Sequence, residues 1–532
     1  MSAGTPATHD HLHSISPTDD NGGHRHALSF DGRTTMDDET MTDLQLKERT
    51  RDQNLTLQKL TVCHTEDDNN FDPNSEAVRR VRWKVDRRLI PLLSLLYLCS
   101  FLDRVNIGNA KIANLGQDLK LEPGIYNLSL SIFYVGYIVG EIPANLALKR
   151  FGPRRWIPLV MLSWAGVSMS MAAVTNGAGL LATRLFLGLA ESGYAPGPSY
   201  IISLWYSRRE QAIRIGIFFS SATVAGAFGG LLAYAIENLN SVQGLHAWQW
   251  IFILEGLPTI LGCFLALWFL PDFPENSNFL TPAETALVIQ RLRIDAGPAT
   301  ESAFSWGEVG SAFTDWKVYH YIFIGFMHAV PFSSLGVFVP AITLGFGFDP
   351  VTTQLATAPI YIAACLATLS MAWSSDHFSE RGYHAAFAEA MACLGYVLLI
   401  VTRNSSLGAR YISLMICAMG VYSAIPIQLS WPSNNIGGAT KKGVALAAII
   451  SLAQLGSILG GQIYREDDAP KYTRGHTISA CFLFANIFNS LALKYLLKRE
   501  NSRRDDLSTI DYEEERHGCD LTDKHPDFRF WI

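Results

Sequence analysis

Charge is scarce in this chain. Of its 532 residues, 17% are charged, against roughly 25% in soluble domains. The charged residues crowd into the two ends and a middle segment, and the rest of the chain reads as separate apolar runs. This distribution argues against a soluble enzyme with one large core. The net charge of −6 averages over unlike segments and indicates no class of partner, and we expect no nucleic-acid partner.

Paired cysteines are also absent. The eight cysteines are scattered without a CxxC pair, and six of them lie inside apolar runs, where cysteine behaves as a small hydrophobe. We therefore expect neither a disulfide framework nor a zinc site. HDHLH at 9–13 and HRH at 24–26 could bind a metal, but with no fold to preorganise them we interpret them as incidental. The polar start of the chain predicts no cleaved signal peptide, and the first apolar run, from Leu89, is expected to be a signal-anchor.

Twelve apolar segments, each of about the length that spans a membrane as a helix, follow the polar start. They form two sets of six, which predicts an all-α membrane protein with two six-helix bundles. The segments are 89–112, 125–147, 156–175, 178–205, 213–236, 248–270, 319–346, 352–373, 384–402, 409–429, 443–463 and 475–497.

Polar stretches bound and divide these segments. The middle stretch contains apolar residues at helical spacing, from Ala286 to Ile294, which predicts an amphipathic helix at the membrane surface. The polar N-terminal stretch has no lasting apolar periodicity, and both cytoplasmic tails are expected to be disordered. The expected domains are a tail (1–84), the first bundle (85–271), a linker (272–317), the second bundle (318–498) and a second tail (499–532).

Lysine and arginine in the short loops predict the orientation. The loops after the second and fourth segments are basic, whereas those after the third and fifth contain neither residue. Both termini are therefore expected in the cytoplasm. The second half is less decisive, because Lys441 and Lys442 compete with Arg403 and Arg410 on the opposite side; we interpret the two lysines as following the same charge bias.

The fourth segment carries two charges, Arg184 and Glu191. They are seven positions apart, which places them on one helix face about 10 Å apart along the axis. A charge within hydrocarbon costs roughly 2.5–3.5 kcal/mol and usually faces a cavity or a partner. Repeated intramembrane charge in twelve spans is typical of a transporter. A sterol enzyme or a receptor would more naturally carry a histidine cluster or another number of spans.

Several motifs resemble those of the major facilitator superfamily, specifically its anion:cation symporter branch and the fungal group of allantoate and nicotinate permeases. The resemblance covers about residues 85–500 and implies two six-helix bundles with the substrate site at their interface. The motifs are FLDRVNIGNA (101–110), GEIPANLALKRFGPRRW (140–156), TRLFLGLAESGYAPG (183–197), WQWIFILEGLPT (248–259) and WPSNNIGGATKKG (431–443). REDDAPKYTRGH (465–476) and the closing DFRFWI are also similar to that fungal group.

One loop departs from the pattern of the family. The loop signature between the second and third segments normally has an acid before its basic pair, and here Lys149 occupies that position. The corresponding loop of the second half supplies an acid, Asp376. Gating by Arg150, Arg154 and Asp376 is therefore expected only in a modified form.

Two arginines are the expected substrate ligands. Arg104 lies about 24 Å along its helix from Arg88, and Arg184 lies some 9 Å from the end of an oppositely directed helix, so both reach a similar depth. Two guanidinium groups facing one cavity can grip a carboxylate. The alternative is that each forms an ion pair, Arg104 with Asp103 and Arg184 with Glu191. The resemblance supports ligation, since sugar-acid and glutamate transporters of the family use arginines at the matching motif positions.

Asp103 and Glu191 are the candidates for proton coupling. A carboxylate that alternates between an apolar setting and a nearby arginine loads and releases a proton. In similar transporters the Asp of LDR and the Glu of the fourth-helix motif have this role. The alternative is a permanently paired, structural carboxylate.

The remaining candidates are less defined. Tyr137 matches a position near the substrate in sugar-acid relatives, and Glu141 has a packing or gating role or a substrate contact. Glu255 is expected to be a structural, hydrogen-bonding acid. Three residues after the tenth segment could stack on a flat ring and bind its substituents, or end the helix at the membrane interface; they are Trp431, Asn434 and Asn435.

The leading hypothesis is a monomeric, proton-coupled importer of a small organic anion, such as a vitamin-like carboxylate, in the fungal plasma membrane. No nucleotide-binding loop is present, so an ion gradient rather than ATP is expected to supply energy, and no cofactor is expected. Two alternatives stay open: an exporter of an anionic secondary metabolite, and a nutrient sensor that barely transports.

Overall fold

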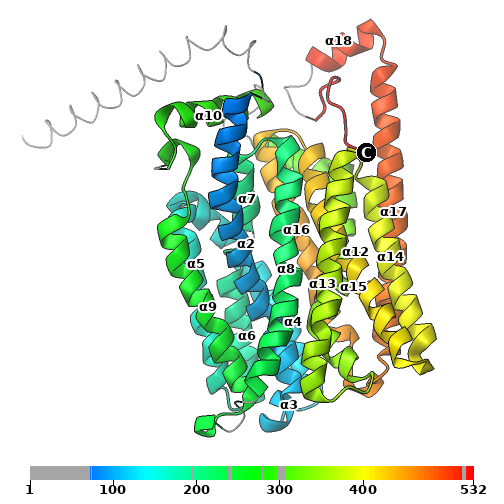
Figure 1. Ribbon diagram of the computed structural model, residues 1–532. Coiled ribbons are helices and arrows are strands. Elements are labelled where there is room, and N and C mark those ends of the chain that lie inside the picture. The colour runs from blue at the N-terminus through cyan, green and yellow to red at the C-terminus, as the bar shows by residue number, and fades with distance from the viewer. Residues whose placement is uncertain are drawn as a thin grey trace, which may run out of the picture. The chain divides into compact units, whose positions relative to one another are not determined.

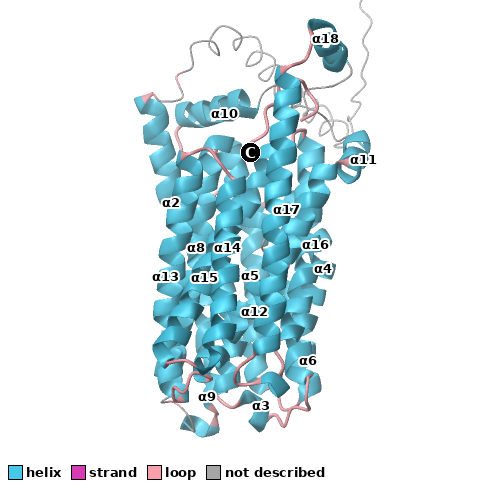
Figure 2. Cartoon of the chain, turned by 90° about the vertical axis from the view of Figure 1, so that its right-hand side faces the viewer, coloured by secondary structure: helices cyan, strands magenta, loops and turns pink. Residues whose placement is uncertain are grey.

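The computed structural model describes residues 72, 75–194, 196–237, 239, 242–277, 279–296, 306–517 and 523–532. The chain has two compact units, Met1–Phe71 and Asp72–Ile532, and all described residues belong to the second. The regular structure of these residues is entirely helical (Figures 1 and 2), as predicted. The expected disorder of residues 1–71 and the two histidine-rich motifs lie outside the described residues.

The helices follow the expected order. The first half contains α2 (Glu76–Ile112), α3 (Leu115–Asp118), α4 (Ile125–Phe151), α5 (Pro153–Ser170), α6 (Gly177–Glu191), α7 (Pro196–Trp205), α8 (Arg208–Glu237) and α9 (Ala247–Phe269). The linker contains α10 (Pro282–Ala296) and α11 (Trp306–Thr314). The second half contains α12 (Trp316–Leu344), α13 (Pro350–His377), α14 (Gly382–Val401), α15 (Leu407–Asn435), α16 (Ala439–Ile463), α17 (Thr473–Asp505) and α18 (Thr509–His517).

Ten helices in the described part are long and apolar enough to cross a membrane. The other two expected segments are helical as well: 125–147 lies in α4, and 178–205 is divided between α6 and α7. The division follows from the sequence, because α6 ends at Glu191 and Pro196 begins a new helix. Proline is favoured at a first helical position because its missing N–H would have no helical partner there.

The helix bundle has two ends, called here the terminal end and the distal end. The terminal end is where α2 begins and α17 ends, and the distal end is where α2 ends and α4 begins (Figures 1 and 2). In the first half α2 packs on α8 and α9, and α4 on α6; in the second half α12 packs on α16, and α14 on α15 and α17. The halves meet where α8 packs on α13, α4 on α16 and α2 on α12.

The tails and the linker are more structured than expected. Helix α2 begins at Glu76, inside the predicted N-terminal tail, and α17 and α18 continue into the predicted C-terminal tail. The expected amphipathic helix is α10, which is tied to the terminal end: the Arg291 Nη2 donates to the Trp205 carbonyl oxygen at 2.9 Å, and the Lys84 Nζ lies 2.8 Å from a Glu284 carboxylate oxygen. These contacts join the linker to the first half.

Candidate functional site

A buried ion pair joins α2 to α6. The Arg104 Nη2 lies 2.5 Å and its Nε 3.2 Å from the Glu191 Oε1, which also accepts a 2.6 Å hydrogen bond from the Ser100 hydroxyl. The Glu191 side chain is 1% exposed, and that of Arg104 13%. Glu191 therefore pairs with Arg104, not with Arg184 as the ion-pair alternative supposed.

Arg184 lies close by without an anionic partner in the described part of the chain. Arg184 is 1% exposed. Its Nε donates a long hydrogen bond of 3.4 Å to the Ser129 carbonyl oxygen, whereas its Nη1 has no hydrogen-bond partner among the described residues. Both arginines contact the Phe133 ring: its centroid is 4.8 Å from the Arg184 Cζ and 5.4 Å from the Arg104 Cζ. The structure thus brings the two arginines to one ring, consistent with the similar depth predicted for them.

Glycines allow this arrangement by bringing α4 against α6. A Cβ on Gly188 would lie 1.9 Å from the Phe133 carbonyl oxygen, and one on Gly136 would lie 2.3 Å from the Leu185 carbonyl oxygen. Gly140, one turn beyond Gly136, is equally close to the Ser192 side chain. Small residues four apart are the usual way for helices to approach within a membrane. The close contact between α4 and α6 brings the Phe133 ring against Arg184.

Asp103 belongs to a different site. Its Oδ2 accepts hydrogen bonds from Thr259 (2.7 Å) and Trp164 (3.2 Å), and its Oδ1 accepts one from Ser168 (3.0 Å). These donors lie on α5 and α9, inside the first half. Asp103 therefore does not pair with Arg104. Glu255 on α9 is fully buried with no hydrogen-bond partner for either carboxylate oxygen among the described residues, which differs from the expected hydrogen-bonding acid.

Further buried polar atoms without partners lie on α2 and α4, the helices that carry Arg104 and Phe133. The Tyr137 hydroxyl is buried and unpartnered, and its ring centroid is 5.5 Å from the Arg104 Cζ. Glu141, one turn further along α4, accepts a 2.9 Å hydrogen bond from Ser451 on α16 with one oxygen, while the other has no partner. Both amide atoms of Asn106 on α2 are also unpartnered. Such buried orphans are costly and need an explanation, which a polar ligand would supply.

The expected ligands from the second half lie elsewhere. The Trp431 Nε1 donates to the Trp531 carbonyl oxygen at 2.9 Å, and Asn435 exchanges two hydrogen bonds with the Trp531 backbone. The polar groups of Trp431 and Asn435 are thus occupied by the end of the chain at the terminal end. Asn434 is half-buried with an unpartnered Nδ2.

Among the described residues, no hydrogen bond or ion pair joins Arg150 or Arg154 to Asp376. Arg150 and Arg154 are exposed. The Asp376 Oδ1 is 2.6 Å from the Nη2 of Arg381, in its own loop. A gating role for these residues stays a prediction.

The distal end is closed by hydrogen bonds between the halves. The Asn127 amide on α4 donates to the carbonyl oxygens of Gly461 (2.8 Å) and Tyr464 (2.7 Å). In return the Gln462 amide donates to the Asn127 carbonyl oxygen (3.0 Å) and to the Ser131 hydroxyl (2.7 Å). These bonds join the first turns of α4 to the last turns of α16.

We expect the Asn127→Ala substitution to favour an open distal end. It removes two hydrogen bonds and leaves buried carbonyl oxygens unpartnered in the closed state, at a cost of about 1–3 kcal/mol. Spin labels on the exposed residues Glu122 and Asp467 would report a longer and broader distance distribution than in the unsubstituted protein. Asn404→Ala, which removes an exposed amide bonded to Lys471 at the same end, is the control. Identical distributions would contradict the assignment of these bonds as the distal closure.

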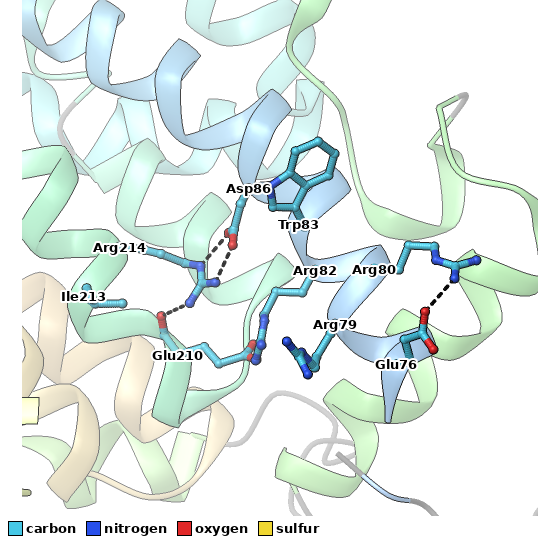
Figure 3. A pocket seen from close by; sticks show the side chains of 9 residues that line it. All are labelled: Glu76, Arg79, Arg80, Arg82, Trp83, Asp86, Glu210, Ile213 and Arg214. Carbon is cyan, nitrogen blue, oxygen red and sulfur yellow. Dashed lines mark hydrogen bonds and ion pairs between the residues drawn. The ribbon is translucent and has the colours of Figure 1, made fainter. Parts of the chain in front are cut away.

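A large open pocket lies at the terminal end, away from the arginine pair. It has a volume of about 1020 Å³ between α2 and α8 (Figure 3). Its charged side chains are largely engaged with one another: Arg214 chelates Asp86 with two 2.7 Å contacts, and the Arg82 Nη1 lies 2.8 Å from the Glu210 Oε1. These ion pairs join the ends of α2 and α8. Most of the charged side chains in the pocket are therefore already paired and not available to bind a ligand.

Two residues of the site were not predicted. Phe133 and Ser100 carry no charge and stand in apolar runs. Only the structure shows that Phe133 contacts the two arginines and that Ser100 donates a hydrogen bond to Glu191. The signal in the sequence is indirect: Phe133 and Tyr137 are four positions apart, on the face of α4 that turns to Arg104.

Buried, incompletely paired charges within a bundle of membrane-length helices are typical of a membrane transporter. Residues 93–461 match the family model of the Major Facilitator Superfamily, and the chain belongs to this family. It is 38% identical to the MFS transporter prlL of a fungal species (strain NRRL 50135), covering 79% of this chain and 87% of the relative. It is 33% identical to the MFS-type transporter efuF of Hormonema carpetanum, over 80% and 86%.

The fold is that of solved transporters of the same superfamily. The xylose transporter XylE from E. coli, in a partially occluded inward open conformation, superposes with a TM-score of 0.61 over 76% of this chain and 97% of XylE. The sequences are 13% identical. The predicted all-α fold of a multi-pass membrane protein of this superfamily is thereby confirmed, with ten of the twelve predicted spans among the long apolar helices of the described residues. The relatives named above are transporters and not enzymes.

Proposed function

We propose that the protein imports a small organic anion together with a proton. In this proposal it is a monomer in the fungal plasma membrane with both termini in the cytoplasm, and it belongs to the anion:cation symporters related to allantoate and nicotinate permeases. The substrate is a carboxylate of nicotinate or allantoate size. The observation that carries the proposal is Arg184, a buried guanidinium without an anion.

An unpaired buried cation is strongly unfavourable. The effective cost of burying an ion is several kcal/mol, which only a well-placed counter-ion offsets. In the described residues the nearest carboxylate of the site, Glu191, is already bound to Arg104. A substrate carboxylate between Arg184 and Arg104 would satisfy the free Nη1 and could accept bidentate hydrogen bonds. The aromatic side chains of Phe133 and Tyr137 beside the arginines suit a flat or compact acid.

Binding of the anion then provides the coupling to a proton. If Arg104 turns from Glu191 to the substrate, Glu191 keeps only the Ser100 hydroxyl as a partner. A carboxylate without its cation in an apolar surrounding is disfavoured in its charged form, so we expect Glu191 to take up a proton as the anion binds. Release of the anion returns Arg104 to Glu191 and expels the proton. Asp103, hydrogen-bonded within the first half, is left with a supporting role.

Uptake of labelled acids by cells that express the chain tests the proposal. We expect faster uptake of an accepted acid at external pH 5 than at pH 8, after subtraction of the uptake by cells without the protein. Nicotinate and its uncharged amide form a matched pair, and only the acid should be carried. Equal uptake at both pH values would overturn proton coupling, and equal uptake of acid and amide would overturn anion recognition. Faster efflux than uptake from preloaded cells would indicate an exporter.

A further inference from the structure

The last ten residues, 523–532, are held against the terminal end of the second half and are called here the C-terminal segment. Its backbone pairs with side chains on two helices. The Phe530 N–H donates to the Asn501 Oδ1, and the Asn501 Nδ2 donates back to the Phe530 carbonyl oxygen, both at 2.9 Å. The Trp531 N–H donates to the Asn435 Oδ1 at 2.7 Å. Asn501 on α17 and Asn435 on α15 thus each donate one hydrogen bond to the backbone of the segment and accept one from it.

Asp523 anchors the start of the segment. It is fully buried, and its carboxylate lies 2.6 Å from the Lys317 Nζ and 2.7 Å from the Lys441 Nζ. Both lysines also contact Asp315, the residue that caps α12. Burial alone would raise the pKa of Asp315, but the two lysines outweigh it and lower that pKa. The cluster therefore has two cations and two anions, all nearly excluded from water.

Arginine and aromatic contacts hold the rest of the segment. The Arg504 Nη1 donates to the Phe528 carbonyl oxygen at 2.7 Å, and its Nη2 donates to the Asp523 carbonyl oxygen at 3.0 Å. The Phe530 ring is 4% exposed and lies between the Lys317 Nζ and the Arg504 Cζ, at 4.6 and 4.5 Å. The buried residues of the segment thus contact lysine and arginine side chains and asparagine amides of the second half.

The segment contacts both sides of a weak point in the fold. Helix α15 contains Pro426 and Pro432 near its end, and proline removes a backbone hydrogen bond from a helix interior. The connection to α16 contains Gly438 with a φ of +81°, a conformation that favours glycine. Before this connection Asn435 holds Trp531, and after it Lys441 holds Asp523. The segment therefore bridges the joint between α15 and α16.

We propose that the ends of α12, α15, α16 and α17 form a docking site for an acidic–aromatic peptide, occupied by the C-terminal segment, and that the docked segment braces the α15–α16 connection. All these helices belong to the second half, so the brace stiffens this half and does not fasten it to the first. The inference concerns this joint and does not rest on the substrate proposed above.

Hydrogen exchange of the full-length purified protein tests the docking site and the brace without any substrate. In the unsubstituted protein we expect slow exchange in the peptides covering 523–532 and 432–443. Asp523→Asn leaves the two lysines with only one carboxylate, and Trp531→Ala removes the contact with Arg381. Both substitutions should accelerate exchange about tenfold in these two peptides, because local opening becomes easier, while peptides of α5 stay unchanged.

Asp527→Asn is the matched control, because Asp527 is exposed and contacts Tyr512 on α18 instead of the lysines. It should leave both peptides protected. Fast exchange of 523–532 in the unsubstituted protein would overturn docking. Fast exchange of 523–532 in the variants with unchanged exchange of 432–443 would overturn the brace. Unchanged exchange of 523–532 in Asp523→Asn would overturn the role of Asp523 as the anchor.

Discussion

Replacement of Arg104 by glutamine is expected to reduce anion uptake about 100- to 4000-fold. The substitution leaves Glu191 buried without a cation, and removal of one partner of a buried ion pair typically costs about 3–5 kcal/mol, where each 1.4 kcal/mol is about tenfold. It also removes one of the two guanidinium groups assigned to the substrate. Arg104→Lys keeps the charge without the planar fork, so uptake between that of the unsubstituted protein and that of Arg104→Gln is expected. The measurement is initial uptake of an accepted labelled acid, normalised to protein in the membrane.

A double substitution separates binding from mere neutralisation. Arg104→Gln combined with Glu191→Gln removes both charges and should restore the amount of folded protein but not uptake. Restored uptake in the double variant would show that Arg104 only compensates Glu191. Arg474→Gln removes an exposed arginine from the distal start of α17, and uptake should be unaffected in this control.

Replacement of Gly188 by alanine is expected to lower the thermal stability of the purified protein by several degrees and to abolish uptake. The added Cβ would overlap the Phe133 carbonyl oxygen at 1.9 Å, so α4 and α6 have to separate. Overpacking of this kind typically costs about 1–3 kcal/mol, and the separation displaces the Phe133 ring from the two arginines. Thermal unfolding followed by tryptophan fluorescence gives the stability, and uptake gives the function.

Gly166 provides the control for this substitution. It is an exposed glycine within α5, and a Cβ there meets nothing within 4 Å. Gly166→Ala should be neutral or slightly stabilising, since alanine favours a helix by up to about 1 kcal/mol over glycine. If Gly188→Ala behaved like Gly166→Ala, the close α4–α6 contact would not be what positions Phe133.

The spans and the depth of the arginines could be predicted because both depend on length alone. A run of about 20 apolar residues crosses a membrane whatever its neighbours are, and a rise of 1.5 Å per residue fixes how deep Arg104 and Arg184 lie. Their contact with the common Phe133 ring does not follow from depth alone and depends on how the helices pack. The proposed role in anion binding rests on the same geometry.

The pairing of the charges could not be predicted from spacing. Arg184 and Glu191 share a face, but α6 ends at Glu191, where the neighbouring α2 brings Arg104 into reach. Asp103 and Arg104 are adjacent in the sequence and therefore point about 100° apart around the helix. This difference sends Asp103 toward α5 and α9, inside the first half.

The role of Trp431 and Asn435 could not be predicted for another reason. Their partner, Trp531, is about 100 residues away in the chain and follows the last membrane segment. No local sequence pattern predicts a contact over such a separation. Lys441 likewise follows the predicted charge bias of the loops, yet it is buried against Asp523.

The balanced cluster around Asp523 has a consequence for handling the protein in solution. Dissolved ions weaken attractions between exposed charges, and the screening length falls from about 8–10 Å at physiological ionic strength to about 3 Å at 1 M salt, but they do not enter a dry group of two lysines and two aspartates. A surface contact such as Arg503 with Glu515 is therefore open to screening, whereas the anchor of the C-terminal segment is not. We therefore expect concentrated salt during purification to leave the last ten residues in place.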